Sequence, residues 1–257
     1  MKEIMESKQI FDPVHGFISL TPLMIKIVDT FEFQRLRDLK QLGTCYRVFP
    51  SAKHDRAEHS FGVSHLARTM MRSLRQRQPE LNITDRDIEL VQIAALVHDI
   101  GHGPYSHVFD HYIKKEHEPE HEDRGCEIFK MLVLKYKLDL TKREIEQINQ
   151  MIVPSIKDGW KYQIVANTRN QIDVDKIDYI MRDCYHIGFR CSSDLTRIVT
   201  ECRVIDDTIC FPEKIRYTIF TLFTTRYRLH KQVYNHPVVV SYEFMVVEIL
   251  KEIMKMN

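Results

Sequence analysis

The 257-residue sequence contains little glycine and proline, only 8 Gly and 9 Pro, and a single tryptophan. So few turn-forming residues argue against a many-turned β fold and favour long, uninterrupted helices. No apolar run approaches the roughly 20 residues that a membrane-spanning helix needs. With 44% hydrophobic and 28% charged residues, the composition is that of a folded globular protein, and we expect no membrane segment.

Neither sign of charge dominates, because 37 Lys and Arg stand against 36 Asp and Glu. Without a basic field, nucleic acid is expected only as a minor partner. The opening residues MKEIMESKQIFD lack the apolar stretch of a secretory signal, and the six cysteines include no CxxC pair. We therefore expect an intracellular protein, cytoplasmic or nuclear and not secreted, with reduced thiols.

Residue periodicity predicts a mostly α fold in one domain over residues 1–257, with two short β-hairpins. The hairpins are expected at 8–20 and 202–211, where short apolar stretches flank turn-forming residues. Helices are expected over residues 56–74, 84–99, 174–187, 212–236 and 238–255.

Capping residues predict where several of these helices begin and end. Thr84 is expected to cap one helix, and Gly101 to stop it. Pro104 suits the first turn of a further helix, which would carry two histidines and an aspartate. Gly188 is expected to end the helix that precedes it.

Three separated stretches carry histidine and aspartate at spacings that suit one site. His59 begins an apolar helical stripe, where an imidazole is costly to bury unless it is hydrogen-bonded or bound to a metal. His98 and Asp99 fall at a helix end, from which both can point into one cleft. Two helix faces repeat polar residues every four positions. They comprise Asp175, Tyr179 and Asp183 on one helix, and Arg226, His230 and Tyr234 on another.

Imidazole nitrogens combined with carboxylate oxygens suit a divalent transition metal such as Fe, Mn or Zn rather than Ca²⁺. Such a metal would leave positions open for water and a phosphate oxygen, and it would make hydroxide available near neutral pH. The predicted ligands are His59, His98, Asp99 and Asp175.

Other polar residues nearby have a plainer interpretation. An isolated histidine is more often a hydrogen-bonded structural residue than a ligand, and His111 is expected at the surface. Asp178 and Arg182 fit a solvated pair four residues apart. The histidines interpreted as ordinary polar residues are His15, His54, His65, His117 and His186.

The pattern H…HD…D, formed by the four predicted ligands, resembles the HD-domain metal-dependent phosphohydrolases. Further blocks narrow the resemblance to the catalytic core of the dNTP triphosphohydrolase that carries a sterile alpha motif beside its HD domain. These blocks are FQRLRDLKQLG, RAEHSFGVSHLA, HDIGHGPYSHVFD, IDVDKIDYIMRDCYHIG and TRYRLHKQVYNH. They run in the same order from about residue 8 to 240. None of the blocks in these 257 residues resembles the sterile alpha motif or the family's long C-terminal lobe, and we expect neither to be part of this fold.

This resemblance implies hydrolysis of dNTPs to deoxynucleoside and inorganic triphosphate, with metal at the predicted ligands and Mg²⁺ bridging the triphosphate. It assigns His121, acting with Asp110, to proton transfer to the leaving O5′. From its polar surroundings alone, His121 would instead be expected at the surface. The residues matched to the phosphates are Arg56, His102, His107 and Lys176.

The resemblance also implies a deoxyribose pocket. It assigns Gln41, Tyr179 and Asp183 to the sugar 3′-OH. Tyr179 and Tyr234 are expected to close the 2′ side and so exclude ribonucleotides by their bulk. The remaining residues expected to contact substrate are Leu42, Arg226 and His230.

Relatives of this kind bind a guanine nucleotide and a second deoxynucleotide between subunits. The guanine-binding positions match Lys8, Asp29, Gln34 and Arg37, for which an ordinary charged helix face is the alternative interpretation. At the second pocket Phe11, Pro212 and Pro237 replace polar or basic residues, whereas Phe49, Arg197, Lys214 and His236 remain. We expect a homo-oligomer, a dimer or tetramer, in which GTP or dGTP activates and a second deoxynucleotide matters less.

Two other functions stay open from the sequence. One keeps the HD metal site but acts on another nucleotide or a phosphodiester. The other is a nucleotide- or nucleic-acid-binding module that has lost catalysis, which the complete set of expected ligands disfavours.

Overall fold

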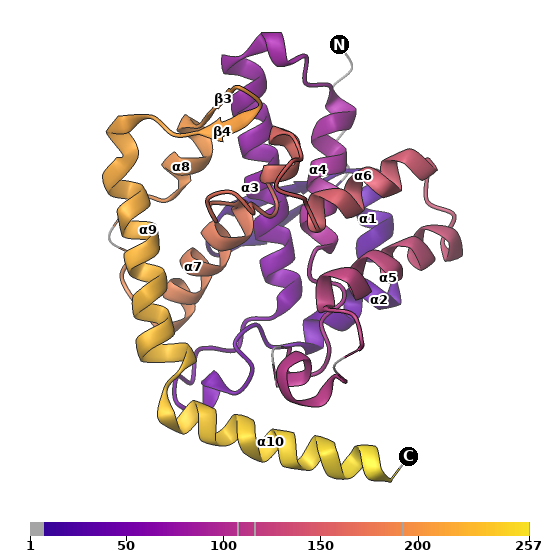
Figure 1. Ribbon diagram of the computed structural model, residues 1–257, viewed down its shortest axis with the longest axis vertical. Coiled ribbons are helices and arrows are strands. Elements are labelled where there is room, and N and C mark those ends of the chain that lie inside the picture. Colours follow the sequence, from indigo (N-terminus) through magenta and orange to yellow (C-terminus); the bar gives the residue numbers. More distant parts are fainter. Residues whose placement is uncertain (1–7, 107, 116, 192, 257) are drawn as a thin grey trace.

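The computed structural model describes residues 8–106, 108–115, 117–191 and 193–256, and it is mostly helical (Figure 1). In chain order the α-helices are α1 (Pro22–Val28), α2 (Phe31–Gln34), α3 (Arg56–Arg77), α4 (Asp85–Val97), α5 (His121–Lys135), α6 (Lys142–Ile152), α7 (Val174–Ile187), α8 (Thr196–Glu201), α9 (Arg216–Leu229) and α10 (Pro237–Lys255). Two one-turn π-helices, η4 (Phe109–Ile113) and η7 (His230–Tyr234), and a 3-10 turn, η1 (Arg35–Asp38), adjoin them.

Helix α3 forms the centre of the fold and packs against α4, α7 and α8 (Figure 1). Its predicted stripe is confirmed, because the apolar side chains at positions 63, 66, 70 and 74 are all buried. They belong to a hydrophobic core that runs from Ile18 in the first hairpin to Val239 in α10. The first turn of α3 lies beside the end of α4 and the start of α7, and this brings the three predicted metal-binding stretches together.

Both predicted hairpins are confirmed. β1 (Lys8–Asp12) pairs antiparallel with β2 (Gly16–Leu20), and β3 (Arg203–Ile205) pairs with β4 (Thr208–Cys210). The second hairpin turns through two aspartates at positions 206 and 207, both with positive φ, as a tight two-residue hairpin turn requires.

Most predicted helix ends are also found. Thr84 makes a capping box with Asp87 at the start of α4, and Gly188 ends α7 with a φ of 74°. α4 ends at Val97, earlier than Gly101, so His98 and Asp99 begin the turn that follows.

The helix expected from Pro104 does not begin there. Tyr105 and Ser106 have φ values of 59° and 52°, a left-handed backbone that cannot belong to a right-handed helix. The helical turn in this region is η4, which starts at Phe109. The sequence analysis made no prediction for α5 and α6.

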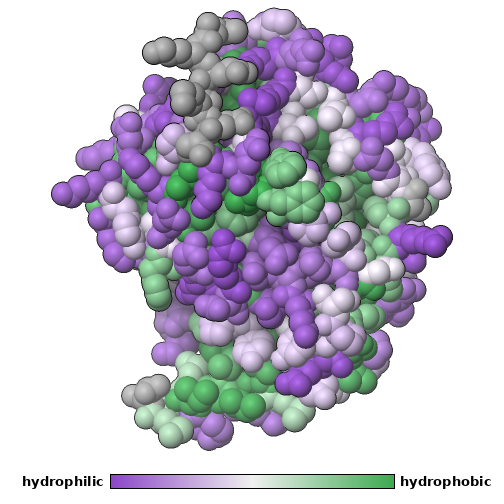
Figure 2. Space-filling view, turned by 180° about the vertical axis from the view of Figure 1, so that it is seen from behind, coloured by the Kyte–Doolittle hydropathy of each residue, from purple (hydrophilic) through white to green (hydrophobic). Residues whose placement is uncertain are grey.

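The last helix, α10, runs along one end of the molecule (Figure 1). Its inner face packs on η4, where Val247 is buried with Val108 and Ile113. Its outer face is apolar and exposed, as the hydrophobic area at the lower end of Figure 2 shows. The exposed side chains of this face include Val238, Met245, Ile249 and Ile253. No helix of the described residues is both long and apolar enough to cross a membrane.

Candidate active site

Three of the four predicted metal ligands converge from three helices. Ligand atoms of His59, His98 and Asp175 all lie within 4.8 Å of one another. His59 Nε2 is 3.0 Å from Asp175 Oδ1, and His98 Nε2 is 3.5 Å from the same oxygen. The fourth, Asp99, adjoins this set, with Oδ1 3.5 Å from His98 Nε2 and Oδ2 3.8 Å from His59 Nε2.

Each imidazole is oriented by an acceptor on its other nitrogen. His59 Nδ1 lies 2.7 Å from Asp178 Oδ2, and His98 Nδ1 lies 2.8 Å from the carbonyl oxygen of Ala95. An acceptor at Nδ1 holds the proton there and leaves Nε2 as the donor atom toward a metal. Among the described residues, His98 Nε2 is buried without a hydrogen-bond partner. These residues therefore fit a divalent cation.

The charges of the cluster fit a cation as well. Burial alone would lower the pKa of His59, but hydrogen bonds to Asp175 and Asp178 raise it to about 10. Burial alone would raise the pKa of Asp99, but Arg56, His98 and His102 hold it well below its usual range. The carboxylates are thus ionised, and the imidazoles beside them are protonated. A bound divalent cation would replace the imidazole protons and supply positive charge in their place.

Asp178 is the main residue that the sequence analysis missed. It and Arg182 are fully buried, so their interpretation as a solvated pair is wrong. Asp178 binds Arg182 Nε at 2.9 Å and His15 Nε2 at 2.6 Å, while Arg182 also donates to Asp12 at 2.8 Å. The turn of the first hairpin, which carries Asp12 and His15, thus supports the carboxylate that orients His59.

A sequence signal for this network was available in Gly62, in the middle of α3. A Cβ at this position would lie 1.9 Å from Asp178 Oδ1 and 2.3 Å from the Arg182 guanidinium. Glycine in a helix interior is otherwise unfavourable by roughly 1 kcal/mol. Its presence here indicates a close approach of another element rather than a helix end.

Next to the cluster lies a group of cationic and proton-transferring side chains. Arg56 donates to Asp99 at 2.5 Å and to Ser106 Oγ at 2.7 Å, and His102 Nε2 is 3.2 Å from Asp99. His121 stacks on His102, with ring centroids 3.9 Å apart. The structure therefore brings the predicted phosphate-binding residues Arg56 and His102 to the metal-binding residues.

His121 also meets its predicted partner, since its Nδ1 is 3.3 Å from Asp110 Oδ2. The surface position suggested by its polar surroundings is wrong, because its side chain is only 18% exposed. Burial would raise the pKa of Asp110, but hydrogen bonds from His102 and Arg124 lower it. Gly101 allows this approach, since a Cβ there would lie 2.0 Å from the carbonyl oxygen of His121.

Two predicted phosphate residues are not placed in the pocket. His107 lies outside the described residues. Lys176 is not among the pocket-lining residues, and its ammonium binds Asp173 at 3.0 Å.

The predicted sugar-reading residues form the neighbouring wall. Tyr234 donates to Asp183 Oδ2 at 2.5 Å, and Arg226 donates to the Tyr179 hydroxyl at 3.1 Å. The other oxygen of Asp183 lies 2.7 Å from His54 Nε2. His54, interpreted above as an ordinary polar residue, therefore fixes the Asp183 carboxylate and stacks on His186 at 4.3 Å.

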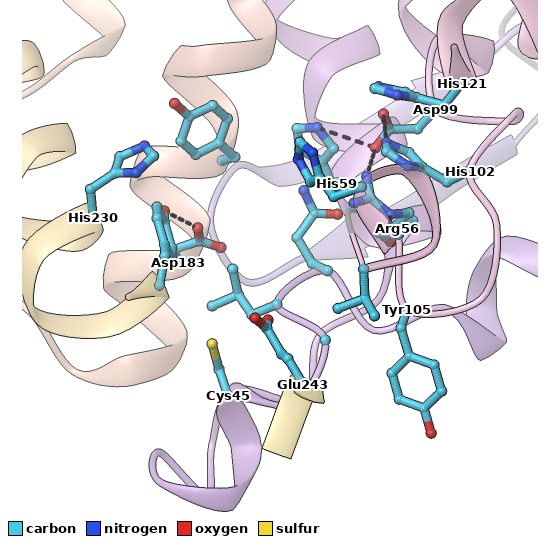
Figure 3. Close-up of a pocket in the computed structure, with 18 of the residues that line it drawn as sticks. Cys45, Arg56, His59, Asp99, His102, Tyr105, His121, Asp183, His230 and Glu243 are labelled. Atoms are coloured by element: carbon cyan, nitrogen blue, oxygen red, sulfur yellow. Dashed lines mark hydrogen bonds and ion pairs between the residues drawn. The ribbon is translucent and has the colours of Figure 1, made fainter. Parts of the chain in front are cut away.

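One pocket of about 580 Å³ connects these walls (Figure 3). Most predicted substrate residues line it, namely Gln41, Leu42, Arg56, His102, Tyr179, Asp183, Arg226, His230 and Tyr234. Tyr105, His111, His121, Asn235 and Glu243 line it as well.

A model of the HD domain matches residues 56–183, which span all four predicted metal ligands. The chain belongs to the HD-domain family. It is 43% identical over 96% of its length to the deoxynucleoside triphosphate triphosphohydrolase SAMHD1 homolog of Dictyostelium discoideum, of which it covers 49%. It is 43% identical over 90% of its length to SAMHD1 of Bos taurus, covering 45% of that protein. It is also 38% identical to the putative HD domain-containing protein L394 of Acanthamoeba polyphaga mimivirus, over 92% of this chain and 56% of that protein.

The chain spans about half the length of the curated relatives it matches. An HD domain implies a divalent metal, and the His and Asp groups described above are able to hold one.

The predicted guanine-binding residues lie away from the HD-domain pocket. Asp29 and Arg37 do not lie on one charged helix face, because α1 ends at Val28 and Arg37 lies in η1. Both side chains are exposed, as is Lys8 on β1. Gln34 links the two segments, donating to the Val28 carbonyl at 2.7 Å and accepting from Arg37 at 3.0 Å.

At the predicted second nucleotide pocket, the remaining basic side chains are already paired. Glu201 binds both Arg197, at 3.3 Å, and Lys214. Phe11, which stands where a polar or basic residue is expected, is 71% exposed.

Proposed function

We propose that this protein is a metal-dependent deoxynucleoside triphosphate triphosphohydrolase, which converts dNTP and water to deoxynucleoside and inorganic triphosphate. One observation carries the proposal: a single pocket joins the HD cluster, formed by the four predicted metal ligands, to cationic side chains and to the hydrogen-bonded wall of Tyr179, Asp183 and Tyr234. The relatives from Dictyostelium discoideum and Bos taurus are named deoxynucleoside triphosphate triphosphohydrolases, which supports the same reaction.

In this proposal the chain's own residues hold the triphosphate beside the metal site. A bound divalent cation would act as Lewis acid and lower the pKa of water. Arg56 and His102 neutralise and orient the phosphates, because cationic donors bind phosphate oxygens strongly. As water attacks Pα, the bond from Pα to O5′ breaks and His121 gives its proton to O5′, while the proton released by the water passes to solvent. Asp110 holds His121 in the orientation and charge state for that transfer.

The sugar wall supports selection of deoxyribose. The Tyr234 hydroxyl and His54 fix the two oxygens of Asp183, so this carboxylate is held ready to accept from a 3′-OH. Tyr179 stands on the same helix face, one turn away from Asp183. We propose that the rings of Tyr179 and Tyr234 leave no room for a 2′-OH.

Several finer points belong to the same proposal. The resident metal is Fe, Mn or Zn, because imidazole and carboxylate ligands suit these ions. Mg²⁺ accompanies the substrate and bridges its triphosphate. The protein acts inside the cell, in the cytoplasm or nucleus, consistent with six free cysteines among the described residues. Residues 1–257 form one HD-type phosphohydrolase domain.

The test is one incubation of purified protein with each dNTP and NTP, with and without GTP, followed by separation of the products. Deoxynucleoside and triphosphate in equal amounts are the expected products, with NTPs hydrolysed far more slowly. Pyrophosphate or orthophosphate as the primary product would point to another nucleotide phosphohydrolase. Binding without turnover in the metal-loaded protein would point to a nucleotide-binding module.

We also propose a homo-oligomer, dimer or tetramer, that GTP or dGTP activates and that depends little on a second deoxynucleotide. The exposed apolar face of α10 supports association with a second copy. Glu201 supports the weak dependence, because it already neutralises Arg197 and Lys214. Asp29→Ala should lower any GTP stimulation and leave metal content unchanged. Sedimentation with added nucleotides checks the assembly, and a tetramer that forms only with both nucleotides would contradict it.

A further inference from the structure

Glu243, from α10, differs from the other carboxylates of the pocket wall. Each of the others is held by a neighbour: Asp99 by Arg56, Asp175 by His59, and Asp183 by His54 and Tyr234. Within the described part of the chain, the Glu243 carboxylate makes no hydrogen bond or ion pair, although it is half-buried and lines the pocket.

The packing of α10 on η4 aims this carboxylate into the pocket. Val247, one turn after Glu243 on the same face of α10, is buried against Val108 and Ile113. A ring contact between Tyr112 and Phe244, with centroids 5.7 Å apart, joins the same two elements. Figure 3 shows Glu243 rising from α10 into the cavity. The side chain is therefore seated by packing rather than left free on the surface.

Burial raises the pKa of Glu243, whereas the charge of His111, which lines the same pocket, lowers it. The other neighbours make this region suited to an uncharged group with hydrogen-bond donors. Burial raises the pKa of Cys45, and the Glu243 and Asp183 charges add to the rise, to about 12, so the thiol is neutral. Leu42 and Gly43 contribute apolar and backbone surface to the same wall. A second negative group, such as a phosphate, would be repelled by Glu243, so the triphosphate must point away from α10.

This argument rests on the proposed function. In that function the HD cluster and Arg56 hold the triphosphate, and Asp183 with Tyr234 holds the sugar. The wall that remains, with Leu42 and Glu243, is left for the heterocyclic base.

We infer that Glu243 is a specificity-determining residue, which accepts hydrogen bonds from the base and favours guanine. An ionised carboxylate only accepts hydrogen bonds. Guanine offers two adjacent donors, its ring N1–H and its 2-amino group, which match the two carboxylate oxygens. Adenine and cytosine place one amino group beside an acceptor nitrogen, and thymine places one N–H between two carbonyl oxygens. In these three bases an acceptor atom would face a carboxylate oxygen, and two acceptors repel each other.

The test compares kcat/KM for dGTP and dTTP in the wild type, in Glu243→Gln and in Glu248→Gln. All assays contain the same saturating GTP, so that dGTP cannot differ merely as an activator. Glu243→Gln keeps the side-chain size but replaces one acceptor oxygen by a donor. The wild type should prefer dGTP over dTTP, and Glu243→Gln should reduce that preference by roughly tenfold, the loss of one charge-assisted hydrogen bond. Glu248→Gln makes the same chemical change at an exposed position of the same helix and should leave the ratio unchanged.

A second readout does not need turnover. Binding of dGTP and dTTP is measured by calorimetry, in the same saturating GTP, on the His98→Ala/Asp99→Ala variant, with and without Glu243→Gln. The dGTP affinity should fall by roughly tenfold relative to dTTP. Unchanged dGTP/dTTP ratios in both measurements, including an equal loss for the two nucleotides, would overturn the inference and leave Glu243 with a structural role. If the wild type hydrolyses no dNTP, the proposed function fails, and the binding measurement decides the inference by itself.

Discussion

The two ends of the pocket are built in opposite ways. At the metal end, His59 and Asp175 come from α3 and α7, whereas His98 and Asp99 directly follow α4, and all four are hydrogen-bonded to neighbouring groups. At the α10 end, His111 and Glu243 come from a one-turn π-helix and a peripheral helix, held by a separate small cluster around Val247. One end is part of the main core, and the other is attached to it.

This difference indicates that the two ends of the pocket have different roles. Residues that must keep fixed distances to a metal belong to the cooperative core, where a displaced side chain costs stability. Glu243, inferred above to distinguish the bases, lies at the attached end, where a substitution should cost little stability. Changes at the metal end should therefore alter both stability and chemistry, whereas Glu243→Gln should alter mainly selectivity.

The largest effect is expected from removing the metal ligands themselves. His98→Ala/Asp99→Ala should strip the divalent metal and lower dNTP hydrolysis at least about a thousandfold, because the Lewis acid is lost. Metal analysis and product assays measure this, and circular dichroism should show an unchanged helical content. The exposed His117 serves as control, and His117→Ala should keep full metal and activity. Full turnover by the double variant without bound metal would sink the metal-site assignment.

The second effect concerns Asp178, the carboxylate that orients the imidazole of His59. Asp178→Ala leaves the fully buried Arg182 with only Asp12, and it removes the acceptor for His59. The free energy of unfolding should fall by about 3–5 kcal/mol, as for other broken buried ion pairs. Metal affinity should fall roughly 10–100-fold.

Urea denaturation and metal titration measure these two losses. The matched control is the exposed pair Lys255–Glu252, where Glu252→Ala should change neither quantity. An Asp178→Ala protein as stable as the wild type would show that the network is not part of the cooperative core.

A smaller effect is expected at the sugar wall. Tyr234→Phe removes the hydroxyl that holds Asp183 at 2.5 Å and should lower kcat/KM for dNTPs about tenfold. Tyr234→Ala should in addition raise the rate for ATP relative to dATP, because it opens the 2′ side. The exposed Tyr227 provides the control Tyr227→Phe. Equal discrimination against ATP in Tyr234→Ala would remove this ring from the sugar gate.

The smallest effect should come from the cluster that seats α10. Val247→Ala removes two methyl groups from a small cluster and should cost about 1 kcal/mol of stability. Metal content should stay unchanged, since α10 contributes no ligand. A loss of metal on this substitution would contradict the separation of the two ends.

Local sequence patterns correctly predicted those elements that are determined by interactions between neighbouring residues. Thr84 and Gly188 predicted helix ends because capping involves only neighbouring residues. The spacing of histidine and aspartate predicted the metal-binding cluster because all four predicted ligands lie within one turn of a helix end. These ends are the start of α3, the end of α4 and the start of α7. The turn at Tyr105 and Ser106 was missed, since positive φ in two non-glycine residues has no local signal of that kind.

The buried role of Asp178 could not be read from periodicity. An aspartate and arginine four residues apart satisfy each other equally well in solvent or in a core. What buries them is contact with Asp12 and His15, and the latter is 163 positions away from Asp178. Only Gly62, a glycine without a helix end to explain it, indicated that another element comes close.

That long-range contact has a consequence for how the chain folds. The hydrogen bond between His15 and Asp178 closes a loop of 163 residues, and contacts of such separation form late because the chain loses entropy before it gains them. We therefore expect the network that holds the partner of His59 to be completed only when the first hairpin has docked. Added metal should therefore bind only molecules that have completed folding. It should slow their unfolding and leave the rate of the earlier refolding steps unchanged.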